Sequence, residues 1–430
     1  MKLSLITLGC PKNTVDSEMI RGSLNEPFVQ FVEPDEEPEV IIINTCGFIQ
    51  SAKEEAIDTI FEAVQLKTEG RCRKVVVTGC LVNRYQDELI QEIPEVDAFV
   101  DHRDLPKMVQ NLKAILGIEN QDFYDRKLLT LPHYAYLKIA EGCSNNCTYC
   151  AIPIIRGPLR SRLPDEIIAE ANKLVKTGVR ELIVIAQDIT NYGKDLDNSV
   201  GLTKLIEPII NIPDLQWIRL MYAHPAHFTD DVIDLIAESG KICKYVDLPI
   251  QHISNGILKR MNRKVTRAQI ENLIQKLRDK IPDIAIRTSL ILGFPGESED
   301  EFQELMDFVR DIRFDRLGAF SYSKEEGTVA YNYNETVAPD VISERIGEIM
   351  EIQAQISFER NENLVGRTLD VIVDEYDVEA KKYLGRTQWD APEIDNIVWI
   401  ERNPEITPGQ LCQVRVDSVF EFDLNAQYMK

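Results

Sequence analysis

Short apolar runs alternate with longer amphipathic stretches along most of the chain. In residues 1–124, three runs rich in Ile and Val stand out: Lys2–Leu8, Val40–Ile43 and Lys74–Thr78. Helical stretches such as Ser51–Lys67 separate them. Strands that alternate with helices indicate a parallel sheet that is buried on both faces. The pattern therefore predicts an N-terminal α/β domain over residues 1–124.

Residues 125–363 continue this alternation after a stretch typical of a linker, Gln121–Pro132. Repeated β–α units of this length predict a parallel barrel, and six of them predict an incomplete (β/α)6 barrel. The six strand-like runs are Tyr136–Ala140, Glu181–Ala186, Trp217–Tyr222, Tyr245–Pro249, Ile284–Leu292 and Leu317–Tyr322. Pro339–Asn363 reads as a closing amphipathic helix. The stripe that we expect it to bury is Ile342, Ile346, Ile349 and Ile352.

Residues 364–430 show the shorter alternation of antiparallel strands. Thr368–Val373 and Leu411–Val416 are typical runs, and Pro408-Gly409 marks a turn. We predict a small antiparallel β-barrel, with Cys412 in its core. This region carries 7 basic and 13 acidic residues, a net charge of 7 − 13 = −6.

The composition changes this picture in two ways. The 430 residues suffice for two to four domains, and the net charge of −23 argues against broad binding to nucleic acid. The chain shows no export signal and no apolar run long enough to span a bilayer, so its nine cysteines are expected to be reduced thiols or metal ligands. We expect a cytoplasmic protein without a membrane partner. The acidity also favours a basic partner, although it could merely keep the protein soluble.

Cys143, Cys147 and Cys150 form a C-x3-C-x2-C run after the first predicted barrel strand. A loop this dense in thiols is typical of an iron–sulfur cluster. Three ligands on a cubane of four irons leave one iron open to bind another molecule. The alternative is a structural zinc knuckle or scattered core thiols, but zinc sites usually pair their cysteines in two separate hooks.

A second set of three cysteines follows the three N-terminal strands. Cys10, Cys46 and Cys80 each come directly at a strand end, and two of them follow a glycine. Ligands of open α/β sheets bind at the carboxyl ends of the strands, so these thiols are expected to converge on a second cluster. Ordinary buried cysteines are the alternative. Cys72 precedes the third strand, at the opposite edge, and is left out of the site.

The C-x3-C-x2-C run resembles the radical S-adenosylmethionine (SAM) superfamily. With the second thiol set and the small C-terminal barrel, essentially the whole chain resembles the methylthiotransferase family, which has an N-terminal methylthiotransferase domain, a radical SAM core and a C-terminal TRAM domain. The expected segments are residues 1–124, 125–363 and 364–430. The resemblance is carried by Leu8-Gly9-Cys10-Pro11-Lys12-Asn13 with Val15–Glu18, by Asn44–Ile49, by Ala135–Cys143 and by Asp390–Asn396.

These stretches are closer to the protein-modifying branch of the family than to the branch that modifies adenosine in transfer RNA. The resemblance implies methylthiolation of the β-carbon of an aspartate on ribosomal protein S-twelve, a basic partner, and no specific contact with nucleic acid. It implies two [4Fe-4S] clusters and SAM as cofactors, with a reduced electron donor and a sulfur donor as partners. One cluster reduces SAM, a deoxyadenosyl radical removes hydrogen, the other presents sulfur, and a second SAM supplies methyl. The chemistry is carried by cofactors, so no catalytic side chain is assigned.

The resemblance also suggests residues that hold SAM. Tyr149, between two cluster cysteines, is expected to pack on the adenine, with simple packing within the loop as the alternative. Gln187 and Asp188 follow the second barrel strand, where a solvated strand end is equally expected. Gly293 lies in Gly293–Glu297, which either lets backbone approach SAM or forms a tight turn.

A basic run could receive the substrate carboxylate, although a solvated helix face is the commoner explanation. The run comprises Lys259, Arg260, Arg263, Lys264 and Arg267. The histidines His224, His227 and His252 are assigned no chemistry. Two rival functions remain open: methylthiolation of transfer RNA, and a non-catalytic iron–sulfur or zinc protein that docks on ribosomes.

Overall fold

The structure, a computed structural model, describes residues 1–119, 126–196 and 200–430. The chain packs into two compact units, each described here by itself. Unit 1 comprises Met1–Thr130, Glu141–Arg160 and Ser323–Tyr331, and unit 2 comprises Leu131–Ala140, Ser161–Tyr322 and Asn332–Lys430. The predicted boundary between residues 124 and 125, with part of the predicted linker, lies outside the described residues.

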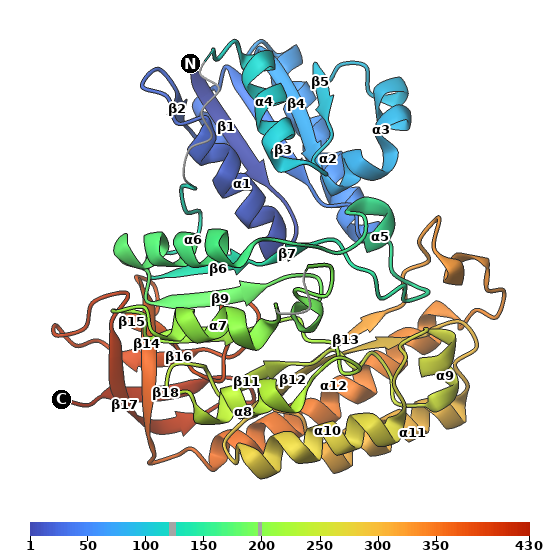
Figure 1. Ribbon diagram of the computed structural model, residues 1–430, viewed down its shortest axis with the longest axis vertical. Helices are drawn as coiled ribbons and strands as arrows, with labels where there is room; N and C mark the ends of the chain where they lie inside the picture. The colour runs from blue at the N-terminus through green and yellow to red at the C-terminus, as the bar shows by residue number, and fades with distance from the viewer. Residues whose placement is uncertain (120–125, 197–199) are drawn as a thin grey trace. The chain divides into compact units, whose positions relative to one another are not determined.

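Unit 1 contains a five-stranded, fully parallel sheet in the order β2-β1-β3-β4-β5 (Figure 1). Its strands are β1 (Lys2–Thr7), β2 (Gln30–Phe31), β3 (Val40–Thr45), β4 (Lys74–Gly79) and β5 (Ala98–Val100). The three predicted strands are present and adjacent. The sequence pattern missed β2 and β5 because runs of two and three residues are too short to show a periodicity.

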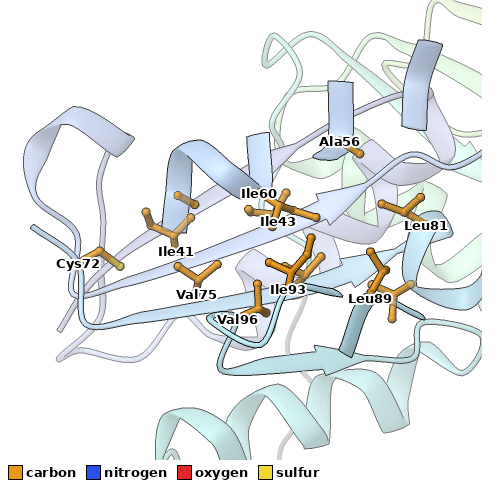
Figure 2. Close-up of a cluster of buried hydrophobic side chains, with 13 residues drawn as sticks. Ile41, Ile43, Ala56, Ile60, Cys72, Val75, Leu81, Leu89, Ile93 and Val96 are labelled. Atoms are coloured by element: carbon orange, nitrogen blue, oxygen red, sulfur yellow. The ribbon is translucent and has the colours of Figure 1, made fainter. Parts of the chain in front are cut away.

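Helices cover both faces of this sheet, as the pattern predicted. They are α1 (Pro11–Ser23), α2 (Gln50–Thr68), α3 (Cys80–Glu92) and α4 (Leu105–Leu116), with a short α5 (Ile152–Ile155) and a 3-10 turn at Pro34–Glu36. On one face, Ile41 and Ile43 of β3 pack with Ile60 of α2 (Figure 2). On the other, Ile42 packs with Met108 of α4. Successive side chains of a strand point to opposite faces, which is why Val40–Ile43 of β3 are all apolar, whereas Asn44 and Thr45 at its carboxyl end are polar and buried.

Cys72 belongs to this core and lies before β4 begins. Its side chain is 5% exposed and packs in the cluster drawn in Figure 2. Its thiol donates to the carbonyl of Lys74 at 3.1 Å. Cys80 follows the last residue of the same strand. The two thiols therefore lie at opposite ends of β4, and Cys72 serves as a matched control for the strand-end cysteines.

Unit 2 contains the predicted incomplete barrel. Two three-stranded parallel sheets, in the orders β6-β9-β10 and β11-β12-β13, are joined by a parallel bridge between Ile218 and Ile242. The strands are β6 (Tyr134–Lys138), β9 (Glu181–Ile185), β10 (Trp217–Leu220), β11 (Tyr245–Asp247), β12 (Ala285–Leu292) and β13 (Arg316–Ser321). All six occur where the apolar runs predicted them.

Helices follow these strands in turn. They are α6 (Pro164–Lys176), α7 (Leu202–Ile210), α8 (Asp230–Glu238), α9 (Asn255–Arg260), α10 (Arg267–Lys280), α11 (Glu299–Ile312) and α12 (Pro339–Glu362), with a 3-10 turn at Ile189–Asn191. A further 3-10 turn, Val329–Asn332, begins in the segment Ser323–Tyr331 of unit 1. A small sheet of β7 (Ala140–Glu141) and β8 (Arg160–Ser161) stands where the chain passes between the units. No helix of the described residues is long and apolar enough to cross a membrane.

The predicted isoleucine stripe of α12 holds only for Ile349, which is fully buried, whereas Ile342, Ile346 and Ile352 are half-buried. The inner face of the helix is partly polar instead. Arg345 donates to Glu297 Oε1 at 2.6 Å, and Gln353 donates to the carbonyl of Phe314 at 3.0 Å. Polar groups can be buried once each finds a partner, and a helical hydrophobic pattern does not reveal such partners.

The C-terminal segment of unit 2 is a closed five-stranded barrel in the order β14-β15-β16-β18-β17, as predicted. Its strands are β14 (Thr368–Asp377), β15 (Lys382–Thr387), β16 (Val398–Glu401), β17 (Leu411–Val419) and β18 (Leu424–Tyr428). One pair, β16 with β18, is parallel rather than antiparallel. Cys412 is 7% exposed and lies in the barrel core, as predicted.

Much of the acidity of this small barrel is used inside unit 2. Asp390 pairs with Arg316 of β13 at 3.0 Å, and Asp395 pairs with Arg287 of β12 at 3.3 Å. Tyr245 of β11 also donates to Asp395 at 2.7 Å. These carboxylates belong to the stretch Asp390–Asn396 and dock it on the larger barrel. The net charge of −6 therefore overstates the acidity that this region offers to a partner.

Arg386 of β15 is the centre of a second buried network. Its guanidinium donates to Glu181 Oε2 at 2.8 Å and to Asp374 Oδ2 at 2.7 Å. Arg219 also donates to Glu181, at 2.8 Å, and His133 bonds Asp374 at 2.8 Å. Buried charges require such partners, so this network fixes the small barrel against the start of β9.

We expect the contribution of Asp374 to stability to depend on pH. Burial raises the pKa of this carboxyl, but Arg386 and His133 outweigh burial and hold the pKa below its ordinary value. A carboxyl whose pKa is lower in the folded state stabilises the fold at neutral pH, and this stability is lost as the pH falls through the folded pKa. The free-energy difference between wild type and Asp374→Asn should therefore be largest at pH 7 and shrink below about pH 4.

Urea unfolding at a series of pH values tests this expectation. All three tryptophans, Trp217, Trp389 and Trp399, lie in unit 2, so their fluorescence follows that unit. Comparing two proteins cancels groups such as Asp395, whose pKa burial raises and which therefore act in the opposite sense. A difference that stays constant or grows toward acid pH would contradict the assignment.

Candidate active site

Three thiols follow the carboxyl ends of three neighbouring strands in unit 1. Cys10 follows β1 and caps α1, Cys46 follows β3 directly, and Cys80 begins α3 after β4. The strands β1, β3 and β4 are adjacent and parallel, which brings their ends to the same edge of the sheet. This topology supports the prediction that the three thiols lie near one another. Two of the thiols, Cys10 and Cys80, also lie at helix N-termini.

Two glycines let these strand ends approach one another. Gly9 has φ +89°, and a Cβ on it would lie 2.9 Å from Cys46 Sγ. Gly79 has φ +102°, and a Cβ on it would lie 2.4 Å from the carbonyl oxygen of Thr45. Both positions combine a left-handed backbone with a contact that a side chain would block, so both require glycine.

The three thiols are close enough to influence one another electrostatically. The pKa of Cys80 is raised to about 12, chiefly by burial; Arg156 opposes this rise, and Cys10 and Cys46 add to it. Burial also raises the pKa of Cys46. Thiols in such surroundings become thiolates when a cation compensates their charge, which is what a metal centre provides.

The residues fit an iron–sulfur cluster by donor chemistry and by placement at one sheet edge. Among the described residues, however, no three Cys, His, Asp or Glu side chains already stand in coordinating geometry around one point. The side chains of Cys10, Cys46 and Cys80 would have to turn toward a common centre as the cluster binds. The role of these three residues as ligands therefore remains a prediction.

The C-x3-C-x2-C loop joins β7 to α5 and also belongs to unit 1. The amide of Cys143 donates to the carbonyl of Gly157 at 3.1 Å, and the amide of Cys150 donates to that of Cys147 at 3.1 Å. Asn146 takes a left-handed conformation with φ 54°, which turns the loop between the first two cysteines. Cys143, Cys147, Cys150 and Tyr149 are all half-buried.

The segment Ser323–Tyr331 packs on this loop, although it is far away in sequence. The amide of Ala330 donates to the carbonyl of Thr148 at 2.9 Å. A Cβ on Gly327 would lie 2.9 Å from Ile154 Cδ1. The backbone of the loop is thus held from two sides, by Gly157 and by Ala330, while its thiols keep partial exposure.

The predicted SAM-binding residues of unit 2 are already engaged within that unit. Asp188 is buried and caps the turn Ile189–Asn191, where it accepts from the amide of Thr190 at 3.0 Å and from Asn191 Nδ2 at 2.7 Å. A solvated strand end is therefore the wrong description of Asp188. Gln187, immediately before it, is half-buried.

Gly293 is held by protein contacts on two sides. Its φ of +72° favours glycine, and a Cβ there would lie 2.3 Å from Ile342 Cδ1, the end of a side chain of α12 that would have to shift. Its amide donates to Glu297 Oε2 at 2.9 Å, and Ser298 then caps α11. The structure thus gives Gly293 the tight turn that was one of the two alternatives for this segment.

The basic run of α9 and the following loop is mostly engaged. Arg260 pairs with Glu335, Arg267 pairs with Glu271 at 2.7 Å and with Glu304 at 2.9 Å, and buried Arg263 donates to the carbonyl of Pro249 at 2.5 Å. Lys259 and Lys264 are exposed. The basic run therefore does not form a wholly solvated helix face.

His224 is buried and stacks on His227 with ring centroids 5.0 Å apart. Burial lowers its pKa to about 2, helped by Arg263. The ring is therefore neutral at physiological pH, so it contributes an imidazole and no charge to this part of unit 2.

Sequence reasoning missed the polar residues that surround the strand-end thiols. Asn13, Asp16 and Arg156 are all less than 4% exposed. Asn13 and Asp16 fall within the stretches that carried the resemblance, at positions 13 and 15–18, but only as letters of a motif. Arg156 follows the cysteine run and had no signal other than its closeness in sequence to Cys150.

Comparison with known proteins agrees with this architecture. Residues 2–101 match the family described as "Uncharacterized protein family UPF0004", residues 137–309 match the radical SAM superfamily and residues 365–429 match the TRAM domain. Among solved structures, the radical SAM methyltransferase TsrM from Kitasatospora setae, with cobalamin and a [4Fe-4S] cluster bound, is similar with a TM-score of 0.56 at 13% identity, over 86% of this chain and 80% of that one. The fold and the C-x3-C-x2-C loop define a radical SAM enzyme.

Relatives over the full length narrow this class. A protein of Clostridioides difficile (strain 630) named "Ribosomal protein uS12 methylthiotransferase RimO" is 45% identical over 436 residues, covering 99% of this chain and 98% of that protein. One of the same name from Geobacter sulfurreducens is 46% identical, covering 98% and 97%. The chain belongs to the RimO family of methylthiotransferases. The family resemblance read from the sequence is thereby confirmed, with its cofactors, two [4Fe-4S] clusters and SAM.

Proposed function

We propose that this protein methylthiolates ribosomal protein uS12, at the β-carbon of an aspartate. The full-length relatives support the activity and the substrate. The observation that carries the proposal in this chain is the pair of cysteine sets in one compact unit. Cys10, Cys46 and Cys80 follow three adjacent parallel strands, and Cys143, Cys147 and Cys150 lie on a loop of the same unit.

Each cysteine set is proposed to hold one [4Fe-4S] cluster. When bound, the clusters and SAM supply the radical that activates an otherwise unreactive C–H bond and the sulfur and methyl group that replace its hydrogen. The protein's own contribution is to fix the ligands. The loop backbone is held by Gly157 and Ala330, and the strand ends meet because Gly9 and Gly79 leave room for them.

Contacts with SAM are proposed for Tyr149, Gln187, Asp188 and Gly293. Tyr149 has the strongest support, because it is half-buried between two cluster ligands. The carboxylate of Asp188 already caps a turn, so its proposed part is to orient that turn. The proposed contact of Gly293 is through its backbone carbonyl, because its amide already donates to Glu297 Oε2.

The remaining proposals concern the setting of the enzyme. The domain limits 1–124, 125–363 and 364–430 are supported by the family matches at 2–101, 137–309 and 365–429. A reduced electron donor and a sulfur donor are proposed as further partners because the reaction consumes electrons and sulfur. The cytoplasm is the proposed compartment because the substrate is a ribosomal protein.

Iron and acid-labile sulfide content of anaerobically reconstituted protein tests the two-cluster proposal. About eight irons per chain are expected for wild type and about four for the Cys10/Cys46/Cys80→Ala variant, because each cubane carries four. Cys72→Ala, a buried thiol in the same unit, should retain about eight. About four irons in both wild type and the triple variant would mean that the strand-end thiols bind no cluster.

The substrate is tested by incubating the reconstituted protein with purified uS12, SAM and a reductant. Mass spectrometry of the aspartate-containing peptide should show the gain of one methylthio group, and Cys147→Ala should abolish it. Modification of transfer RNA instead of uS12 under the same conditions would overturn the substrate assignment.

A further inference from the structure

Arg156 connects the two cysteine sets of unit 1. It follows α5, six residues after Cys150, and is 3% exposed. Its Nε donates to Cys80 Sγ at 3.4 Å, although the two residues are 76 positions apart in sequence. This bond joins the guanidinium of Arg156 directly to a strand-end thiol. A residue next to one predicted cluster loop thus touches a predicted ligand of the other cluster.

The other nitrogens of the guanidinium fix its position. Nη1 donates to Asp16 Oδ2 at 3.2 Å and to Glu141 Oε1 at 2.9 Å, and Nη2 donates to Asn13 Oδ1. All five donors of an arginine lie in one plane, so three anchors leave Nε little freedom to turn away from Cys80.

These anchors are themselves part of the strand-end framework. Asn13 Nδ2 donates to the carbonyls of Leu8 and Thr45, at 2.8 and 3.0 Å, which close the ends of β1 and β3. Asp16 Oδ2 also bonds His102 Nε2 at 2.6 Å. The position of Arg156 is therefore set by the same residues that bring the strand ends together.

We infer that Arg156 is a positioning residue for Cys80 and that its N–H···S bond and buried charge raise the reduction potential of the N-terminal cluster. The inference rests on the proposed function, because it assumes that Cys80 is a cluster ligand. Hydrogen bonds to sulfur and net charge are two of the factors that set cluster potentials. Each stabilises the more negative, reduced state.

Charge alone is the smaller part of this effect. The negative charges of Asp16 and Glu141 offset the positive charge of Arg156. They do not offset the hydrogen bond to Cys80 Sγ, because a carboxylate cannot replace the N–H donor. The guanidinium carries its positive charge because arginine does not lose its proton in proteins, and the carboxylates of Glu141 and Asp16 lie beside it. A raised potential has a use in sulfur insertion. A cluster held by Cys10, Cys46 and Cys80 would supply an acceptor for one electron, because a carbon radical and a sulfur lone pair bring three electrons and a C–S bond uses two.

The alternative is that Arg156 is only a buried ion pair that holds the loop 141–160 to α1. In that case its loss would change stability, but the potential of any cluster at Cys80 would be unchanged. The two roles therefore differ in a quantity that can be measured directly, and that does not depend on turnover.

The test uses full-length protein with Cys143/Cys147/Cys150→Ala as the parent, so that iron binds only at the N-terminal thiols. Arg156→Met removes the donor and the charge, and Arg156→Lys keeps the charge without the fork of donors. The matched control is Arg160→Met in the same segment, because Arg160 is exposed and donates to the carbonyl of Arg103. Iron content, thermal unfolding and a redox titration followed by electron paramagnetic resonance are recorded for each.

We expect Arg156→Met to have the lowest midpoint potential, Arg156→Lys an intermediate one, and Arg160→Met that of the parent. At the midpoint of the parent, the reduced-to-oxidised ratio in Arg156→Met should be at least tenfold lower, which corresponds to a shift of about 59 mV for one electron. Positioning also predicts fewer irons per chain in Arg156→Met, partly restored in Arg156→Lys.

The outcomes separate the inference from the function on which it rests. Unchanged potential and iron content in Arg156→Met overturn the inference and leave the clusters in place. If Arg156→Met does not fold or binds no iron, the lysine variant decides, and a potential equal to that of the parent overturns the inference. A parent that binds no iron overturns the N-terminal cluster itself, and Arg156 is then a structural ion pair.

Discussion

Arg386→Gln should destabilise unit 2 by about 3–5 kcal/mol, the range expected when one partner of a buried ion pair is removed. Arg386 is 3% exposed and donates to both Glu181 and Asp374. Burial raises the pKa of Glu181, but Arg386 and Arg219 outweigh burial and keep the carboxyl ionised. Without Arg386, Glu181 keeps Arg219 and Asp374 keeps only His133 among the partners described here. The small barrel would lose its strongest attachment to β9.

Urea unfolding at pH 7, followed by tryptophan fluorescence, measures this loss because all three tryptophans lie in unit 2. Arg310→Gln is the matched control. Arg310 is about half exposed and pairs with Asp307 at 3.0 Å on the surface of α11, so its loss should change the unfolding free energy by less than about 1 kcal/mol. Equal effects of the two substitutions would show that the Arg386 network does not hold the barrels together.

Gly142→Ala should remove the cluster of the C-x3-C-x2-C loop and leave the other one in place. Gly142 has φ +71°, and a Cβ there would lie 2.1 Å from the carbonyl oxygen of Pro158 and 2.6 Å from that of Gly157. Backbone atoms cannot move aside as a flexible side chain can. The backbone at Gly157 and Pro158, whose Gly157 carbonyl accepts a hydrogen bond from the Cys143 amide, would therefore have to move away from the loop. Iron should fall from about eight to about four per chain, and reductive cleavage of SAM should be lost.

Gly157→Ala is the control for backbone strain. Gly157 also has a left-handed conformation, φ +79°, but nothing lies within 4 Å of the position that its Cβ would take. It should incur only the conformational cost of about 1–2 kcal/mol and keep about eight irons. If both variants lose the same amount of iron, the loop depends on left-handed glycines in general and not on the contact between Gly142 and Pro158.

The longer strands and both thiol sets could be read from the sequence because their signals are local. Parallel strands that are buried on both faces appear as nearly continuous apolar runs, as Val40–Ile43 of β3 does. Cysteines that directly follow such runs can then be placed at one sheet edge without knowing any side-chain contact. The loop of Cys143, Cys147 and Cys150 is local as well, since its spacing alone restricts the kind of metal centre.

Residues whose partners are distant could not be found in this way. The stretch Asp390–Asn396 appeared as a mark of the family and as part of an acidic surface, but Asp390 and Asp395 are buried against Arg316 and Arg287. Likewise, Arg345 of α12 is buried against Glu297, 48 positions away, and no sequence pattern pointed to this pair. An isolated charged residue in a sequence resembles a solvated one, because the partner that permits its burial is many residues away.

The sequence by itself therefore determined that this protein has a parallel α/β sheet, an incomplete barrel, a small β-barrel and two sets of three thiols. Hydrophobic periodicity and short spacing carry that information along the chain. Only the tertiary structure decided that Arg156 reaches Cys80, and that the acidic stretch of the small barrel serves as an internal attachment. Ion pairs and hydrogen bonds act over a few ångströms in space, and only folding brings residues that are 76 or 74 positions apart to that distance.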